Sequence, residues 1–330
     1  MKKTTILLTT FLLATTLVFA QGQPHIKVFS NFNHDVSGEE IENGFKEFEV
    51  KRAYLGYAYQ IDDNFSTKVT FDVGKNDGGS AYTAFLKIAS LTWKANDRTT
   101  INIGMTGTKN FKFMEKGWGK RYIYKSLQDQ HKWANSADVG MTIDYNLSSN
   151  LAIDMQILNG DGYKNVQGSN GLMRGGAGLT YKMGNMNIRV SRDMVPRTEY
   201  ASEYDVQAIS TLAGKLKLGG LDIGGEYNIQ ENAANIIDNT KTGISVYGNY
   251  KLSEKFSVFG RYDNLDSENA NGEQWNIEKD GTLQIFGIER KMAKGVTVAV
   301  NIQNWQDATE DNMPEADVES TLYLNLEYKF

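Results

Sequence analysis

The chain alternates between apolar and polar residues over much of its length. In the final ten residues, TLYLNLEYKF, every second side chain from Leu322 to Phe330 is apolar, and the positions between them are mostly polar. A period of two is typical of a β-strand whose faces meet two different environments. The same split recurs in FSTKVTFDV (65–73), LAIDMQI (151–157), LDIGGEYNI (221–229) and VTVAVNI (296–302). The pattern therefore predicts an all-β protein.

Stretches of this kind recur about sixteen times along the chain. No shift in composition marks a second domain, so residues 21–330 are predicted to form a single domain. The predicted strands lie near residues 24–32, 47–61, 64–75, 81–95, 99–107, 136–147, 150–160, 172–183, 186–195, 204–217, 220–231, 241–252, 255–264, 281–292, 295–305 and 318–330.

The connections between these strands alternate in length. A transmembrane β-barrel has short periplasmic turns and long external loops, and its closure leaves no unpaired strand edge in lipid. A secreted β-sandwich shares the period but needs no such alternation. We therefore predict a transmembrane antiparallel β-barrel of about sixteen strands. The short turns lie near residues 62–64, 95–98, 148–149, 184–185, 219–220, 253–254 and 293–295.

The first twenty residues have the layout of a secretory signal peptide. Lys2 and Lys3 precede an uncharged apolar run from Ile6 to Phe19, and Ala20 supplies a small residue for cleavage. A membrane-spanning helix needs about 20 apolar residues, and this run is shorter and interrupted by Thr. Residues 1–20 are thus predicted to be a signal peptide, and the predicted location is the outer membrane of a Gram-negative bacterium.

Composition adds to this picture. The chain holds 32 Gly, 17 Tyr and 15 Phe but only 3 Pro and no Cys, so a disulfide framework and a thiolate nucleophile are excluded. Many aromatic residues stand near strand ends, where the aromatic girdles of a barrel meet the membrane interfaces. These residues are Tyr54, Tyr57, Tyr59, Trp93, Trp133, Tyr145, Trp275, Trp305 and Tyr328.

Two internal stretches and the last strand carry a resemblance to a known family. RAYLGYAYQIDDNFSTKVTFDVG (52–74) and GWGKRYIYKSLQDQHKWANSADVGM (117–141) resemble outer-membrane porins of Bacteroidota-type bacteria, commonly grouped with the phosphate-selective porin O and P family. The resemblance implies a sixteen-stranded channel, often a trimer, that passes small solutes by diffusion. A phosphate-selective wall is put in question by acids at positions assigned to the lumen, namely Asp72, Asp144, Asp154, Asp222 and Glu226.

A basic stretch lies in the longest predicted loop, residues 108–135. Residues 109–133 hold seven Lys or Arg and two acids, although the whole chain has a formal net charge of -5. The stretch has lost strict alternation and has room for a short helix, and loops of this length usually have a function. In diffusion porins the third external loop folds into the barrel. We therefore expect this third loop to enter the lumen and to focus a positive potential there.

The same argument names candidate residues for the solute path. On the loop they are Lys112, Lys116, Lys120, Arg121 and Lys125, and by strand parity the candidate lumen wall is Arg52, Lys68, Lys87, Arg189 and Arg261. Three other interpretations of the loop charges stay open at this point: they face the exterior, bind lipopolysaccharide, or pair with acids of the lumen.

Catalysis and metal binding have little support in the sequence. The only histidines are His25, His34 and His131, and neither a Gly-x-Ser-x-Gly nor a His-Glu-x-x-His motif is present. Residues 159–165 and 263–274 are rich in oxygen ligands but lack the spacing of an EF-hand, so turn chemistry explains them. No enzyme, no cofactor and no metal site is predicted. Nucleic-acid binding is excluded by the compartment.

The predicted function is that of a porin, a passive channel for small hydrophilic solutes with a weak preference for anions such as phosphate. The predicted partners are lipid, lipopolysaccharide and further copies of the chain, as a trimer. The acidic stretches 263–280 and 307–319 are expected to form a solvated outer face. The alternative is a barrel whose external loops serve adhesion or partner binding, with conduction incidental.

Overall fold

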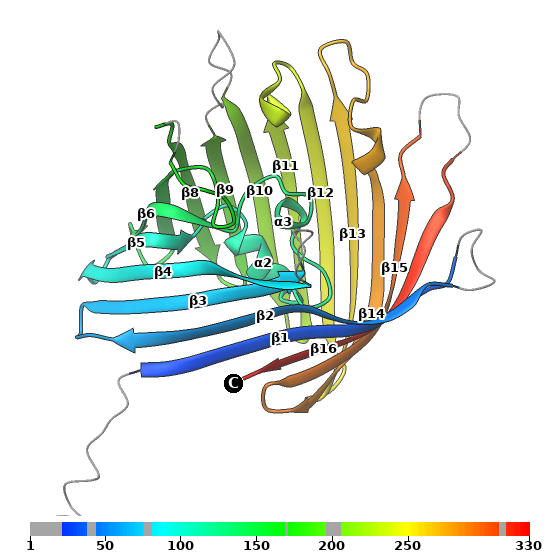
Figure 1. Ribbon diagram of the computed structural model, residues 1–330, viewed down its shortest axis with the longest axis horizontal. Coiled ribbons are helices and arrows are strands. Elements are labelled where there is room, and N and C mark those ends of the chain that lie inside the picture. Colours follow the sequence, from blue (N-terminus) through cyan, green and yellow to red (C-terminus); the bar gives the residue numbers. More distant parts are fainter. Residues whose placement is uncertain (1–21, 38–43, 76–80, 169–170, 196–205, 310–314) are drawn as a thin grey trace, which may run out of the picture.

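The computed structural model describes residues 22–37, 44–75, 81–168, 171–195, 206–309 and 315–330. The predicted signal peptide at residues 1–20 lies outside the described residues. Within them, sixteen antiparallel strands form one closed barrel (Figure 1). The predicted all-β barrel and its strand number are confirmed.

Every predicted strand has its counterpart in the structure. In chain order they are β1 (Gly22–Asp35), β2 (Lys46–Gln60), β3 (Phe65–Lys75), β4 (Tyr82–Asn96), β5 (Thr99–Gly107), β6 (Ala137–Asn146), β7 (Leu151–Leu158), β8 (Arg174–Met183), β9 (Met186–Val195), β10 (Gln207–Leu218), β11 (Leu221–Glu231), β12 (Thr240–Lys251), β13 (Phe256–Glu268), β14 (Gly281–Ala293), β15 (Val296–Asp307) and β16 (Val318–Lys329).

Short helices occur in the connections. The segment between β5 and β6, residues 108–136 and hereafter the β5–β6 segment, holds α2 (Lys112–Trp118) and α3 (Leu127–Gln130). Two 3-10 turns, η2 (Ala233–Asn235) and η3 (Ile277–Lys279), stand in later connections. Within the described part of the chain, no helix is both long and apolar enough to span a membrane.

Each strand pairs with its neighbours in sequence, and β1 pairs with β16 to close the sheet. Two irregularities affect the inner face. Phe29 pairs with Arg52 and Ser30 with Val50, which leaves Lys51 as an extra residue on β2. A second shift between β3 and β4 leaves Lys87 unpaired in the same way. Such bulges place two consecutive side chains on one face of a sheet, and here they add lysines to the interior.

The two faces of the barrel have opposite polarity. Val258, Val300 and Leu324 on the outer face are 36%, 46% and 46% exposed, whereas Asn301 and Asn325 on the inner face are buried. The inner amides bond to each other, since Asn301 Nδ2 donates to Asn325 Oδ1 over 2.6 Å. An apolar outside and a hydrogen-bonded polar inside are the reverse of a water-soluble barrel and suit a lipid environment.

The prediction that aromatic residues near strand ends form girdles is wrong for three of them. Tyr57, Trp93 and Tyr328 are exposed on the outer face as expected. Trp133 is buried in the β5–β6 segment, while Tyr54 and Trp305 pack against buried clusters inside the barrel. The position of a residue along a strand sets the depth of its side chain in the membrane. Whether the side chain points inward or outward depends on strand parity and on bulges. Tyr54 is also part of the candidate solute pathway.

The assignment of Val190 to the outer face and Asn187 to the inner face of β9 predicts that an arginine substitution at each position has a different effect on stability. Val190 lies on the outer face, 46% exposed, and Asn187 lines a hollow inside the barrel. Val190→Arg should lower the free energy of unfolding by about 3 kcal/mol, because it places a charge in hydrocarbon. Asn187→Arg should cost less than about 1 kcal/mol, because that side chain stays in water. Urea unfolding in phospholipid vesicles, followed by tryptophan fluorescence, measures both; equal costs would contradict the assigned faces.

Candidate solute pathway

The helices of the β5–β6 segment lie within the barrel (Figure 1), and aromatic contacts hold its first half against the inner wall. Met114 and Trp118, four residues apart on one face of α2, are both buried. The indole of Trp118 packs on the rings of Tyr247 and Phe259, with centroid distances of 5.7 and 6.1 Å. Gly119 ends the helix with a left-handed φ of 69°, which a residue without Cβ adopts at little cost. The chain can then turn towards β14.

Hydrogen bonds attach the second half of the segment to β10 and β11. Gln128 Nε2 donates to Thr211 Oγ1 over 2.8 Å and to Asn228 Oδ1 over 2.7 Å, and all three side chains are buried. Leu127 packs over Gly243, where an added Cβ would come within 2.8 Å of the leucine. The glycine therefore provides the space that α3 needs to reach the wall.

A buried carboxylate on β14 anchors the middle of the segment. Glu289 accepts hydrogen bonds from Lys120 Nζ over 2.8 Å and from Tyr122 Oη over 2.7 Å. The Lys120 ammonium also lies 4.8 Å from the ring centroid of Phe259. Only 6% of the lysine side chain and 12% of the glutamate side chain are exposed, so the loss of either partner would leave the other charge buried and unpaired. Lys120 thus serves as an anchor and not as a free lumen charge.

The Arg121 guanidinium joins both helices of the segment to β2. Its Nη1 donates to Glu115 Oε2 over 2.9 Å and also bonds Asp129, while Nε donates to the Tyr54 hydroxyl over 3.2 Å. Burial alone would raise the pKa of Asp129, but the nearby Arg121 and Lys125 outweigh it and lower that pKa. Arg121 is therefore neutralised by carboxylates of its own segment.

Two of the predicted wall residues share one carboxylate. Arg52 Nη1 lies 2.8 Å from Asp72 Oδ2, and Lys87 Nζ lies 3.3 Å from the same oxygen. The hydroxyl of Tyr163, from the connection between β7 and β8, donates to that oxygen over 2.6 Å. The Lys87 ammonium stands 5.1 and 4.9 Å from the ring centroids of Tyr54 and Tyr163. A second connection therefore also reaches into the barrel.

The other predicted wall residues divide into paired and unpaired ones. Arg189 Nη2 donates to Asp154 Oδ1 over 2.8 Å, and Arg261 Nη2 to Asp263 Oδ2 over 2.6 Å. Asp263, which the sequence pattern assigned to an acidic external loop, is thus a buried partner inside the barrel. Lys68 forms no ion pair with any carboxylate of the described residues.

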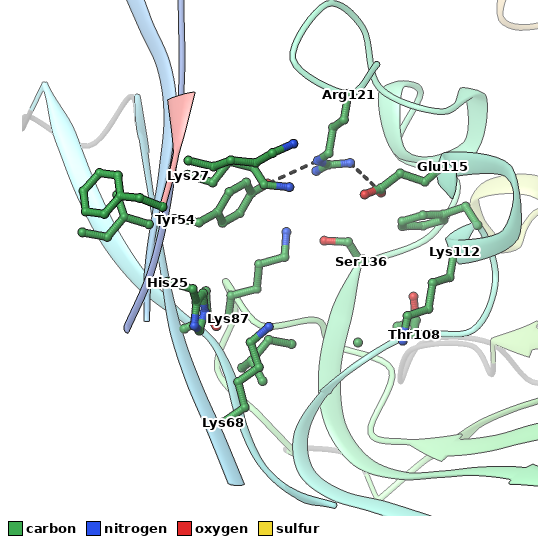
Figure 2. A pocket seen from close by; sticks show the side chains of 17 residues that line it. His25, Lys27, Tyr54, Lys68, Lys87, Thr108, Lys112, Glu115, Arg121 and Ser136 are labelled. Atoms are coloured by element: carbon green, nitrogen blue, oxygen red, sulfur yellow. Dashed lines mark hydrogen bonds and ion pairs between the residues drawn. The ribbon is translucent and has the colours of Figure 1, made fainter. Parts of the chain in front are cut away.

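The space left by the β5–β6 segment is a cavity against β1–β4, hereafter the basic cavity, with a volume of about 530 Å³. Figure 2 shows Lys68 and Lys112 entering it from opposite sides, with Lys87 beside Lys68. Among the described residues, Lys27, Lys68 and Lys112 have no carboxylate within ion-pair distance. Among the lining residues that the structure describes, Glu115 has the one carboxylate side chain. The cationic side chains that line the cavity are Lys27, Lys68, Lys87, Lys112, Arg121 and Lys329.

The last two predicted loop residues lie elsewhere. Lys116 borders a second hollow of about 400 Å³ together with Lys182 and Lys215. Lys125 forms no ion pair within the described part of the chain, and burial together with the neighbouring cations Arg52, Arg121 and Lys51 lowers its pKa to about 8 despite Asp129. Lys125 is thus the loop charge that is easiest to remove by raising the pH.

Sequence reasoning missed Lys27, Tyr54 and Glu289 as parts of this site. The parity of β1 places Lys27 on the same face as Phe29, so that signal was available. Nothing local marks Glu289 as the partner of Lys120, because the two are 169 residues apart. Within the described residues, no group of three or more His, Asp and Glu is arranged to hold a metal ion.

The fold is shared with several solved outer-membrane proteins. OmpF of Salmonella typhi, solved in complex with daunomycin, superposes with a TM-score of 0.68 at 12% identity, covering 94% of this chain and 97% of that one. The outer-membrane channel DcaP of Acinetobacter baumannii gives 0.67 at 12% identity, with the same coverage. OmpT of Vibrio cholerae gives 0.64 at 14% identity, covering 94% and 97%.

No model of a known protein family matches the sequence, and no curated protein is detectably similar to it. The similarity to solved structures shows the fold: the chain has the closed barrel of the outer-membrane porins.

The anchor at Glu289 leads to a prediction about the segment. Glu289→Ala should loosen the β5–β6 segment, because breaking a buried pair from one side costs about 3 kcal/mol. Tryptic cleavage after Lys120 and Arg121, followed by mass spectrometry of the folded protein in detergent, should become much faster. Glu254→Ala in the exposed turn between β12 and β13 is the control and should leave cleavage unchanged. Equal protection in both variants would show that the pair does not hold the segment.

Proposed function

We propose that the protein is an outer-membrane porin, a passive diffusion channel for small hydrophilic solutes that favours anions. The observation that carries the proposal is the basic cavity: six cationic side chains and one carboxylate side chain surround the space between the β5–β6 segment and the wall. A protein whose barrel served only to display loops would not need unpaired lysines there.

The proposed mechanism combines size exclusion with electrostatic selection. The β5–β6 segment narrows the barrel, so solutes must pass close to Lys68 and Lys112. In a narrow passage with low-dielectric walls, unpaired positive charges raise the local concentration of anions and slow cations. Lys120, Arg121 and most wall arginines contribute less to this potential, because carboxylates lie beside them.

We also propose a cellular location, an oligomeric state and a candidate solute. The N-terminal signal-like sequence, the apolar outer face and the porin-like barrel support a location in the outer membrane, in contact with lipid and lipopolysaccharide. One structure of the Vibrio cholerae OmpT is described as a trimer form, which supports a homo-oligomer, and we propose a trimer. Because the sequence resembles the phosphate-selective porin O and P family, phosphate is one candidate anion among several. No catalytic role is proposed.

Ion selectivity in planar bilayers tests the proposal. Under a KCl gradient the wild-type reversal potential should shift towards the chloride equilibrium potential. Lys68→Glu combined with Lys112→Glu should abolish or reverse that shift, since two of the three unpaired charges of the cavity change sign. Lys68→Arg with Lys112→Arg is the matched control and should retain it. The absence of any conductance, or a wild-type preference for potassium, would refute the proposed anion channel.

The lowered pKa of Lys125 predicts that the anion preference of the channel depends on pH. Because this pKa is about 8, the side chain is charged at low pH and loses its charge as the pH rises through that value. Lys125 lies outside the basic cavity but interacts electrostatically with Arg121, which lines it. Anion preference should therefore fall between about pH 6.5 and about pH 9.5. In Lys125→Gln this fall should be strongly reduced, and in Lys125→Arg the preference should stay high across the range. An identical pH dependence in wild type and Lys125→Gln would exclude Lys125 as the titrating group.

A further inference from the structure

The basic cavity has an apolar side as well as a charged one. Tyr54 and Ile88 line it from β2 and β4, and Phe111 lines it from the β5–β6 segment. These side chains lie among the cations instead of being separated from them, since Lys87 directly precedes Ile88 and Lys112 directly follows Phe111. A path for small inorganic ions alone has no use for such surface, because water next to apolar groups is unfavourable.

The Tyr54 ring is held in a fixed orientation. It meets the ring of Phe29 edge-on, with a centroid distance of 5.9 Å and an interplanar angle of 82°. Its hydroxyl accepts the hydrogen bond from Arg121, and the Lys87 ammonium stands 5.1 Å from its centroid. An immobile aromatic surface beside two cations can contact a flat apolar group without a further loss of side-chain entropy.

The size of the cavity suits an organic molecule. Its volume of about 530 Å³ falls within the range of pockets that hold small organic ligands, about 300–1,000 Å³. Lys68 and Lys112 enter from opposite sides (Figure 2), so a ligand with a negative group at each end would contact both while its body lies along the apolar side.

We propose that the basic cavity is a binding subsite for organic dianions whose two carboxylates flank a compact apolar body, such as a single ring. The inference rests on the proposed function and adds a class of solute to it. Lys68 and Lys112 attract the carboxylates, and Ile88 and Tyr54 take up the apolar body. Fully hydrated inorganic anions pass the same cations without using the apolar side.

Block of the chloride current in planar bilayers tests this with two organic dianions of equal charge and one inorganic anion. Terephthalate has a ring between its carboxylates, fumarate has the same charge without a ring, and inorganic phosphate has neither ring nor carboxylate. Terephthalate should reach half-block at a concentration at least about tenfold lower than fumarate or phosphate, because only it buries apolar surface. This comparison needs only the wild-type channel.

Matched variants of Ile88 assign the effect to the cavity. Ile88→Asn keeps the charge and approximate size of the wall but removes its apolar surface, so terephthalate should lose most of its advantage over fumarate. Ile88→Val keeps the apolar surface and should keep that advantage. Lys68→Gln combined with Lys112→Gln should weaken block by both dianions, with the open-channel conductance serving as the check on folding in every variant.

The outcomes separate this inference from the function on which it rests. An anion-selective channel that terephthalate and fumarate block equally would overturn the organic-dianion subsite and leave the porin proposal standing. An advantage of terephthalate that persists in Ile88→Asn would likewise overturn it, because the ring would then bind elsewhere. A protein without conductance in any condition would overturn both.

Discussion

The hydrogen-bonded seam between β1 and β16 is the constraint on which the remaining structure depends. Nine consecutive residue pairs join the two strands, from Lys27 with Lys329 to Asp35 with Thr321. In a bilayer an unpaired edge would leave a row of N–H and C=O groups without partners. Closure at this seam fixes an inside and an outside, and the parity of every strand then decides which side chains meet lipid and which meet the lumen.

Inside the closed barrel the positive charges have two different roles. One set, which includes Lys120, Arg121 and Arg261, is buried against carboxylates and holds the β5–β6 segment to the wall. The other set, Lys68 and Lys112 with Lys27, has no such partner among the described residues. Lys120 and Arg261 hold the segment to β13 and β14, and Arg121 holds it to Tyr54 of β2. The unpaired set lies at the basic cavity, which the segment leaves against β1–β4.

Much of this architecture could be predicted from the sequence. The period of two and the alternating turn lengths are local signals, and they were sufficient for the strand count and for the position of the longest connection. Lys68 and Lys112 were chosen from parity and loop position, and the structure brings both to the basic cavity.

What escaped prediction depends on contacts between distant residues. The pairing of Lys120 with Glu289 spans 169 residues, about half of the chain, so the sequence could not distinguish an anchor from a free charge. Tyr54 was assigned to an outer girdle, although the extra residue Lys51 on β2 and the contact with Phe29 belong to the inner face. The position of a residue along its strand can be predicted from the local sequence. The face on which its side chain lies and the residue with which it pairs depend on the whole barrel.

We propose above all that the basic cavity beside the β5–β6 segment attracts anions. Paired crystal soaks in bromide and in rubidium, located by anomalous scattering, test it most directly. We expect bromide in the basic cavity beside Lys68 and Lys112 and no rubidium there. Rubidium in the cavity, or bromide confined to the outer surface of the barrel, would contradict it.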